Sequence, residues 1–398
     1  MDKKAIFLRE LNFAALSFWL VGSVVMAATA LLWYGQDFRG YYAAALVVIN
    51  GGNPYDYSTL APFLLRATGV IGNNPYYYAP FFAWFIIPFS WLPFNIARIC
   101  WMSFNLILWN FSLWQLSNLL NWPKTGWRRW FLFLLATIIF AWITWRYEQT
   151  GIILFALLVA ALVALQKKNG VAAGIWLALL LIKPNITLIP VLAIVFWLIR
   201  HRNWKPVISL GITIIGLLAI AFMVTPNLIN PFLEPDFGQG LFSTLDGPGR
   251  IVGTRINTTL RDWLLMFHVS SETTRAVSVM ALLLGLVILA IIVWRTNSIY
   301  IVVIVSLLVN YAITPYALQY DYPLLTLVFF WAIALIQYGR KSWINMVGAA
   351  IALFIISIPF WEHPISDGYW IVIGLIGITS CCWYNADKSL VPPDLFHA

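Results

Sequence analysis

Long apolar runs, separated by short polar or basic segments, recur along the whole chain. Most of these runs are long enough to cross the ~30 Å hydrocarbon layer of a bilayer, because a helix rises about 1.5 Å per residue. The pattern predicts an all-α polytopic membrane protein with a single integral-membrane domain over residues 1–398. We expect about twelve transmembrane helices, near residues 12–33, 97–119, 130–146, 151–166, 170–182, 186–199, 206–225, 275–294, 299–313, 323–338, 343–360 and 369–385.

One apolar segment, residues 77–93, does not fit this scheme. Counting it as a crossing would invert every later loop. It also contains Pro80, Pro88 and Pro93, and proline breaks a regular helix. We therefore expect residues 77–93 to form a helix that lies in the outer leaflet or dips into it without crossing, as part of a long first outer loop over residues 34–96.

Composition supports the membrane assignment. The chain is 62% hydrophobic and only 10% charged, whereas soluble domains carry about 25% charged residues. The three cysteines are too few for a disulfide framework, and no Cys/His spacing resembles a zinc site. We expect no cofactor, although the carboxylates of the outer loops leave a divalent metal open.

The placement of positive charge predicts the orientation. Short loops that carry Lys and Arg clusters stay in the cytoplasm, and clusters such as Lys3-Lys4-Arg9, Arg128-Arg129 and Lys167-Lys168 alternate with poorly charged loops. Both termini are then cytoplasmic, and we expect a bacterial plasma membrane. The net charge of +9 is explained by this placement and does not indicate a nucleic-acid partner. The inner loops also lack a phosphate-binding glycine motif, so a water-soluble nucleotide donor is not expected.

The candidate chemistry lies on the outer side. Asp37 follows the first span and is backed by Tyr41 and Tyr42, and a second long outer loop covers residues 226–274. A carboxylate partly removed from water has a raised pKa and suits a general base. The simpler interpretation is that Asp37 only marks the boundary of the first span.

Further charges stand at outer ends of spans. Lys183 is a cation on the side where cations are disfavoured, and it either snorkels to the interface or contacts a lipid phosphate. Arg250 and Arg255 in the second outer loop are weaker candidates for the same phosphate. Glu148 and Asp321 are carboxylates that either bind substrate or pair with a cation such as Arg146.

Several short motifs recur in a characteristic order: Asp37-Phe38, Asn53-Pro54-Tyr55, Tyr78-Ala79-Pro80, Gln149-Thr150-Gly151, Ile182-Lys183-Pro184, Thr314-Pro315-Tyr316 and Tyr320-Asp321. In this order and spacing the sequence resembles glycosyltransferase family 87, a family of GT-C membrane enzymes. The chain departs from it at Glu148-Gln149, where many members have Gly-Gln, and at Leu318-Gln319-Tyr320-Asp321, where many carry histidines.

The resemblance implies a GT-C fold with an outer-face active site and membrane-lying helices in the first outer loop. It implies inverting transfer of a sugar, mannose or arabinose, from a polyprenyl-phosphate donor to a lipid-linked or glycan acceptor at the outer face of the membrane, with membrane lipid as a further partner. Asp37 would be the catalytic base, and Lys183 with Arg250 and Arg255 would bind the donor phosphate. We assign the remaining substrate contacts to Tyr41, Tyr42, Glu148, Gln149, Gln319, Tyr320 and Asp321.

Two other classes remain open from sequence alone. A transporter or lipid flippase would show half-repeats and charges in the middle of spans, whereas here the charges gather at span ends. A structural membrane subunit would not need polar, glycine-rich outer loops. Convergence of the outer acids and cations on one site would favour the enzyme.

Overall fold

A computed structural model describes residues 3–33, 36–69, 76–121, 126–225, 228, 259–314, 317–337 and 373–377. Within these ranges every regular element is helical. In chain order they are α1 (Lys3–Ala30), α2 (Gln36–Ile49), α3 (Tyr57–Thr68), α4 (Pro80–Ser90), α5 (Phe94–Leu119), α6 (Trp127–Ala136), η1 (Thr137–Ala141), α7 (Trp142–Tyr147), α8 (Gly151–Gln166), α9 (Gly170–Leu180), α10 (Pro184–Arg200), α11 (Trp204–Val224), α14 (Leu260–Met266), α15 (Ser271–Arg295), α16 (Ile299–Ile313), η2 (Gln319–Leu324) and α17 (Leu325–Gln337).

Five helical segments in the described part of the chain are long and apolar enough to cross a membrane: Ala5–Ala30, Phe94–Leu119, Trp127–Tyr147, Trp204–Val224 and Ser271–Arg295. Each coincides with a predicted span. α11 and α15 expose most of their apolar surface, as lipid-facing helices do. An aqueous protein does not leave such faces uncovered, so these helices indicate an integral membrane protein.

The other predicted spans have a mixed outcome. Those at 151–166, 170–182, 186–199 and 299–313 are the shorter apolar helices α8, α9, α10 and α16. The span predicted at 323–338 is η2 followed by α17, and those at 343–360 and 369–385 lie outside the described residues, apart from 373–377. The number of crossings, the orientation and the cytoplasmic termini stay predictions.

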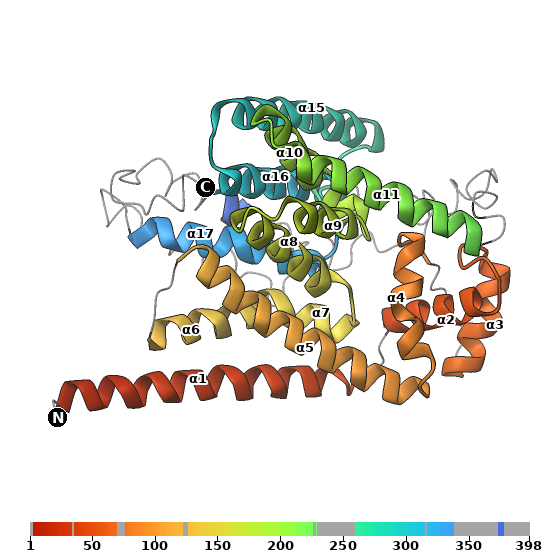
Figure 1. The fold of residues 1–398 in the computed structure, drawn as a ribbon, viewed down its shortest axis with the longest axis horizontal. Helices are drawn as coiled ribbons and strands as arrows, with labels where there is room; N and C mark the ends of the chain where they lie inside the picture. Colours follow the sequence, from red (N-terminus) through yellow and green to blue (C-terminus); the bar gives the residue numbers. More distant parts are fainter. Residues whose placement is uncertain are drawn as a thin grey trace.

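The predicted first outer loop is largely helical, containing α2, α3 and α4. Figure 1 shows these three helices gathered at one end of the molecule, near the end of α1 and the start of α5. Asp56 begins α3 because its carboxylate accepts the Ser58 N–H at 2.9 Å, which satisfies a helix-end donor. Asp37 lies in the first turn of α2, so this part of the first outer loop is helical.

α4 corresponds to the segment 77–93. Pro80 occupies its first turn, where the missing N–H costs nothing. Pro88 lies inside the helix, so our expectation that it breaks the helix was wrong. With 11 residues, α4 extends only about 16 Å and is too short to cross. Its placement in the outer leaflet stays a prediction.

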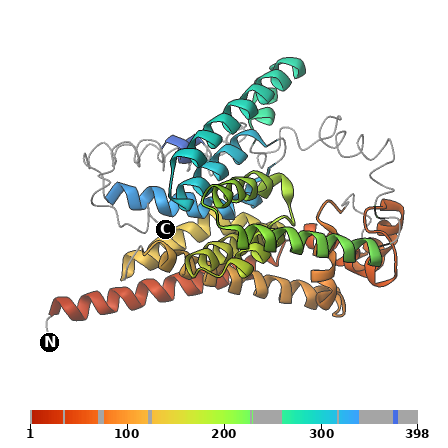
Figure 2. The ribbon, with the colours of Figure 1, turned by 45° about the horizontal axis from the view of Figure 1, so that its top comes forward.

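An aromatic cluster fastens α2 and α4 onto α5. Phe38 stacks on Trp101 with ring centroids 5.3 Å apart, and Phe82 packs between Tyr41 and Trp101. Burial of such side chains dominates core energetics. Figure 2 shows α11 running along the bundle toward this end, while α15 projects upward out of the bundle.

The junction between α7 and α8 fits closely against η2. The helix α6–η1–α7 includes a π-helical turn, a feature often found near functional sites, and it ends at Glu148 with φ 56°. Gly151 then begins α8, where a Cβ atom would collide with the Tyr320 carbonyl oxygen and Pro323. Thr144 donates to that same carbonyl at 2.8 Å. The junction therefore fixes Gln149 and η2 relative to each other.

Candidate functional site

Asp37 is hydrogen-bonded to Gln149, from the junction between α7 and α8. The Gln149 Nε2 amide donates to Asp37 Oδ2 at 2.5 Å, across 112 positions of sequence. Asp37 is partly buried and Gln149 is almost fully buried. The bond occupies one carboxylate oxygen of Asp37 and leaves Oδ1 as an acceptor for a further donor.

Two tyrosines contact the oxygen of the same Gln149 amide. Tyr41 donates to Gln149 Oε1 at 2.9 Å, and Tyr78 donates to the same oxygen at 2.8 Å. Because the Asp37 carboxylate can only accept, the amide nitrogen faces Asp37 and the amide oxygen faces the two hydroxyls. Gln149 is thus held as a donor that stabilises the carboxylate form of Asp37.

Charges around Asp37 act in both directions. Burial raises its pKa from 3.8 to about 6, against the lowering effects of the Gln149 hydrogen bond and the Lys183 ammonium. Asp321 raises this pKa and Arg39 lowers it, each by a smaller amount. A carboxyl group with a pKa near 6 is ionised at neutral pH and is a stronger base than an ordinary aspartate.

Replacing Gln149 with glutamate should raise the pKa of Asp37 further. The change replaces an amide donor with a second carboxylate, and two adjacent carboxylates cannot both ionise easily. In the Gln149→Glu variant, the acid limb of the pH–rate profile should move to higher pH, with a larger loss of rate at pH 6 than at pH 8. Steady-state kinetics across that range would check this, and an unmoved limb would contradict the role of Gln149.

A buried ion pair lies beside the Asp37–Gln149 contact. Lys183 Nζ is 2.5 Å from Asp321 Oδ1, and both side chains are almost fully buried. Asp321 is itself fixed, because its Oδ2 accepts the Leu318 N–H at 3.2 Å and its carbonyl accepts the Tyr311 hydroxyl. Lys183 therefore does not simply extend to the interface.

Tyr78 connects the two groups. Its hydroxyl bonds Gln149, while its ring centroid lies 5.8 Å from Lys183 Nζ, and the Tyr320 ring lies 5.0 Å from the same nitrogen. The backbone repeats this connection, since the Ala79 N–H donates to the Ile182 carbonyl at 3.0 Å. An ammonium between two aromatic faces and a carboxylate is held at a defined position.

The other predicted site residues are placed as follows. Tyr42 donates to the Leu92 carbonyl at 2.8 Å, away from the Gln149 amide. Gln319 and Tyr320 belong to η2, and the Tyr320 ring packs on Tyr147 at 5.5 Å. Glu148 pairs with Arg98 at 2.5 Å and not with Arg146, which stacks on the Trp33 ring. Arg250 and Arg255 lie outside the described residues.

Sequence reasoning missed Tyr78, Arg98 and Arg39 as members of this site. Tyr78 appeared only within a motif. Arg98 carried a usable signal, because it is a cation near the end of a long apolar helix predicted to face outward. Among the described residues no group of three or more His, Cys, Asp or Glu side chains is arranged to hold a metal ion.

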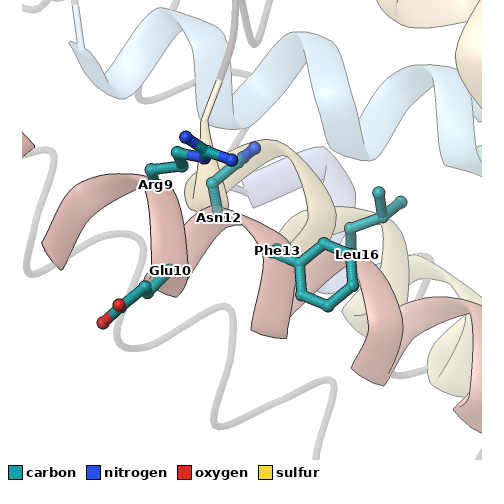
Figure 3. Close-up of a pocket in the computed structure, with 5 residues that line it drawn as sticks. All are labelled: Arg9, Glu10, Asn12, Phe13 and Leu16. Atoms are coloured by element: carbon teal, nitrogen blue, oxygen red, sulfur yellow. The ribbon is translucent and has the colours of Figure 1, made fainter. Parts of the chain in front are cut away.

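A separate cavity lies at the other end of α1. Its lining among the described residues comes from α1 itself: Arg9, Glu10, Asn12, Phe13 and Leu16. Figure 3 shows Arg9 and Asn12 pointing to one side of the helix and Glu10 to the other. The cavity is therefore distant from Asp37, which follows the opposite end of this 28-residue helix.

The fold and these contacts define a helical membrane protein with a polar, ion-paired centre beside its long apolar helices. A comparison with protein-family models matches residues 76–313 to glycosyltransferase family 87. The chain belongs to this family, and our identification from the sequence is confirmed. The matched range includes Tyr78, Gln149 and Lys183, whereas Asp37 precedes it and Asp321 follows it. A search of curated proteins found no match to the chain.

Proposed function

We propose that this glycosyltransferase transfers a sugar from a polyprenyl-phosphate donor to a hydroxyl of a lipid-linked or glycan acceptor, with inversion at the sugar carbon. The observation that carries the proposal is the Asp37 carboxylate, with a pKa near 6, beside the Lys183–Asp321 pair. A base and a cation at one site fit a reaction that removes a proton and releases a phosphate. The family membership supports the same reaction class.

In the proposed step Asp37 accepts the proton of the acceptor hydroxyl. The acceptor oxygen then forms a bond to the anomeric carbon, the bond from that carbon to the donor phosphate oxygen breaks, and polyprenyl phosphate leaves with the electron pair. Asp37 Oδ1 is suited to this role because Gln149 occupies Oδ2. The loss of such a general base costs on the order of 10²–10⁴ in rate.

Lys183 would stabilise the departing phosphate. An ammonium group offers three N–H donors, of which one faces Asp321. A phosphate oxygen can therefore share Lys183 with Asp321, and Arg250 and Arg255 remain proposed contributors from the second outer loop. Of the residues that the sequence assigns to substrate, Gln149 acts through Asp37 and Asp321 through Lys183. The others are Tyr41, Tyr42, Glu148, Gln319 and Tyr320.

A donor screen tests the proposal. The purified protein would be incubated with polyprenyl-phosphate mannose, arabinose and glucose and with a panel of glycolipids and glycans, and the products read by mass spectrometry. A parallel arm would contain nucleotide sugars. We expect a transferred sugar, mannose or arabinose, only from a lipid-linked donor. Turnover with a nucleotide sugar and none with a lipid-linked donor would overturn the assignment.

The pH dependence of rate and stability should report Asp37. Turnover should rise as pH increases through about 6, since the base form is required. For stability the sign is opposite. The pKa of Asp37 is about 6 in the folded protein and 3.8 in the unfolded chain, so the folded protein binds this proton more tightly. The stabilisation from that proton is complete below pH 3.8 and is lost as the pH rises through 6. Thermal unfolding at several pH values, compared with Asp37→Asn, would check the second part.

A further inference from the structure

The start of α5 contacts both sides of the Asp37–Gln149 hydrogen bond. Arg98 Nη2 donates to the Trp33 carbonyl at 2.8 Å, four residues before Asp37. The same guanidinium donates to Glu148 Oε1 from Nε at 2.8 Å and from Nη2 at 2.5 Å, and Glu148 directly precedes Gln149. One side chain thus connects the segment that leads to Asp37 with the segment that leads to Gln149.

Trp101 repeats this connection one turn further along α5. Its indole N–H donates to the Glu148 carbonyl at 3.1 Å, and its ring stacks on Phe38, the residue after Asp37. Residues three apart share one face of a helix, so Arg98 and Trp101 present a continuous surface to both segments. Arg146 adds to this by stacking on Trp33, with its guanidinium carbon 3.7 Å from the ring centroid.

The buried negative charge of Glu148 is compensated by Arg98. Its side chain has no exposed surface, and among the described residues Oε2 has no hydrogen-bond partner. It also adopts φ 56°, a conformation that costs free energy for a residue other than glycine. A buried carboxylate in a strained conformation persists when its surroundings hold it, and here Arg98 and Trp101 do so.

We propose that Arg98, with Trp101, is a positioning residue that holds Gln149 against Asp37. Arg98 contacts neither Asp37, the proposed base, nor Lys183, the proposed phosphate ligand. It acts through Glu148 and Trp33. The inference rests on the proposed role of Asp37 as the base. It assigns the Arg98–Glu148 ion pair to the geometry of the site and not only to the stability of the helix bundle.

Arg98→Lys is the principal test, since it keeps the charge but offers one nitrogen in place of a planar fork. With the donor found by the screen, kcat should fall about 10- to 100-fold because misplacement near 1 Å has effects of that size, while the KM for donor changes little. A weaker Gln149 bond should also move the acid limb to higher pH. The charged and hydrogen-bonding groups that act on Asp37 are Gln149, Lys183, Asp321, Arg39, Tyr41 and Glu148, and Arg98→Lys substitutes none of them.

Arg129→Lys is the matched control. Arg129 also connects two helices, donating from α6 to Ser117 at 2.5 Å and Asn118 at 3.1 Å on α5. Ser117 is about 28 Å from Arg98 along α5. Arg129→Lys should lower thermal stability without moving the pH limb. Equal effects of the two variants on kcat and on the limb would overturn the positioning role.

A second variant distinguishes a loss of positioning from a loss of folding stability. Arg98→Met combined with Glu148→Asn removes both charges, and Asn tolerates the left-handed conformation. This variant should retain thermal stability while its kcat stays low; recovery of kcat with stability would contradict the proposal.

A third measurement needs no activity. The pH dependence of thermal unfolding that disappears in Asp37→Asn should move to higher pH in Arg98→Lys. If Asp37→Asn keeps full turnover, the proposed function fails. If the pH dependence of thermal unfolding in Arg98→Lys stays at the wild-type pH, only the positioning role is refuted.

Discussion

Replacing Asp37 with asparagine should lower turnover by about 10²–10⁴, the range expected for loss of a general base. Asparagine has nearly the same shape, and its Oδ1 can still accept the Gln149 amide hydrogen. Donor binding should therefore persist. The folded protein should be at least as stable as the wild type at pH 8, because burial disfavours the charge that the substitution removes. Product formation from the lipid-linked donor and thermal unfolding at pH 8 would measure both effects.

Asp56→Asn provides the control for this variant. Asp56 belongs to the same group of helices, but its carboxylate caps α3 through Ser58 and Thr59, and these hydrogen bonds lower its pKa. Asparagine is an equally good cap, so turnover should remain close to the wild-type value. Near-wild-type turnover in Asp37→Asn, or an equal loss in Asp56→Asn, would remove Asp37 from the role of base.

Breaking the Lys183–Asp321 pair from one side should have the second large effect. Both side chains are buried, and removal of one partner leaves an uncompensated charge that costs about 3–5 kcal/mol. Lys183→Met and Asp321→Asn should each lower the unfolding free energy by an amount in this range. Denaturant unfolding in detergent would measure it.

The double variant separates stability from function. With Lys183→Met and Asp321→Asn together no buried charge is left alone, and most of the lost stability should return, which makes the two effects non-additive. The binding free energy of the donor should remain less favourable than in the wild type by about 1.5–3 kcal/mol, the value of one charge-assisted contact. Additive losses of stability would contradict the ion pair, and normal donor affinity would remove Lys183 from the phosphate site.

The charged residues that sequence reasoning selected share one property, which is their place at the end of an apolar run. Asp37, Glu148, Lys183 and Asp321 were all found in this way, and the structure places Lys183 against Asp321 and both within electrostatic reach of Asp37. Charges are costly near hydrocarbon, so a charge retained there is informative. The partners were harder to predict. Glu148 pairs with Arg98, 50 positions away, although Arg146 is much nearer in sequence.

The first outer loop illustrates the same limit. Prolines at 80, 88 and 93 indicated interruption, yet Pro80 begins α4 and Pro88 lies within it. The sequence placed Asp37 in an outer loop without assigning it to a helix, whereas the aromatic packing of Phe38 and Tyr41 on α4 and α5 holds that segment as a helix. Local propensity is a weak prior when tertiary contacts of this kind are present.

The sequence by itself determined the class of protein, the positions of the long apolar helices, the family and the identity of Asp37, Lys183 and Asp321 as candidates. These depend on composition and on the order of residues along the chain, which need no third dimension. Only the tertiary structure decided that Gln149 donates to Asp37, that Lys183 is neutralised by Asp321 138 positions away, and that Arg98 joins Trp33 to Glu148. Such contacts arise from how separate helices pack, and the spacing of residues within any one helix does not contain that information.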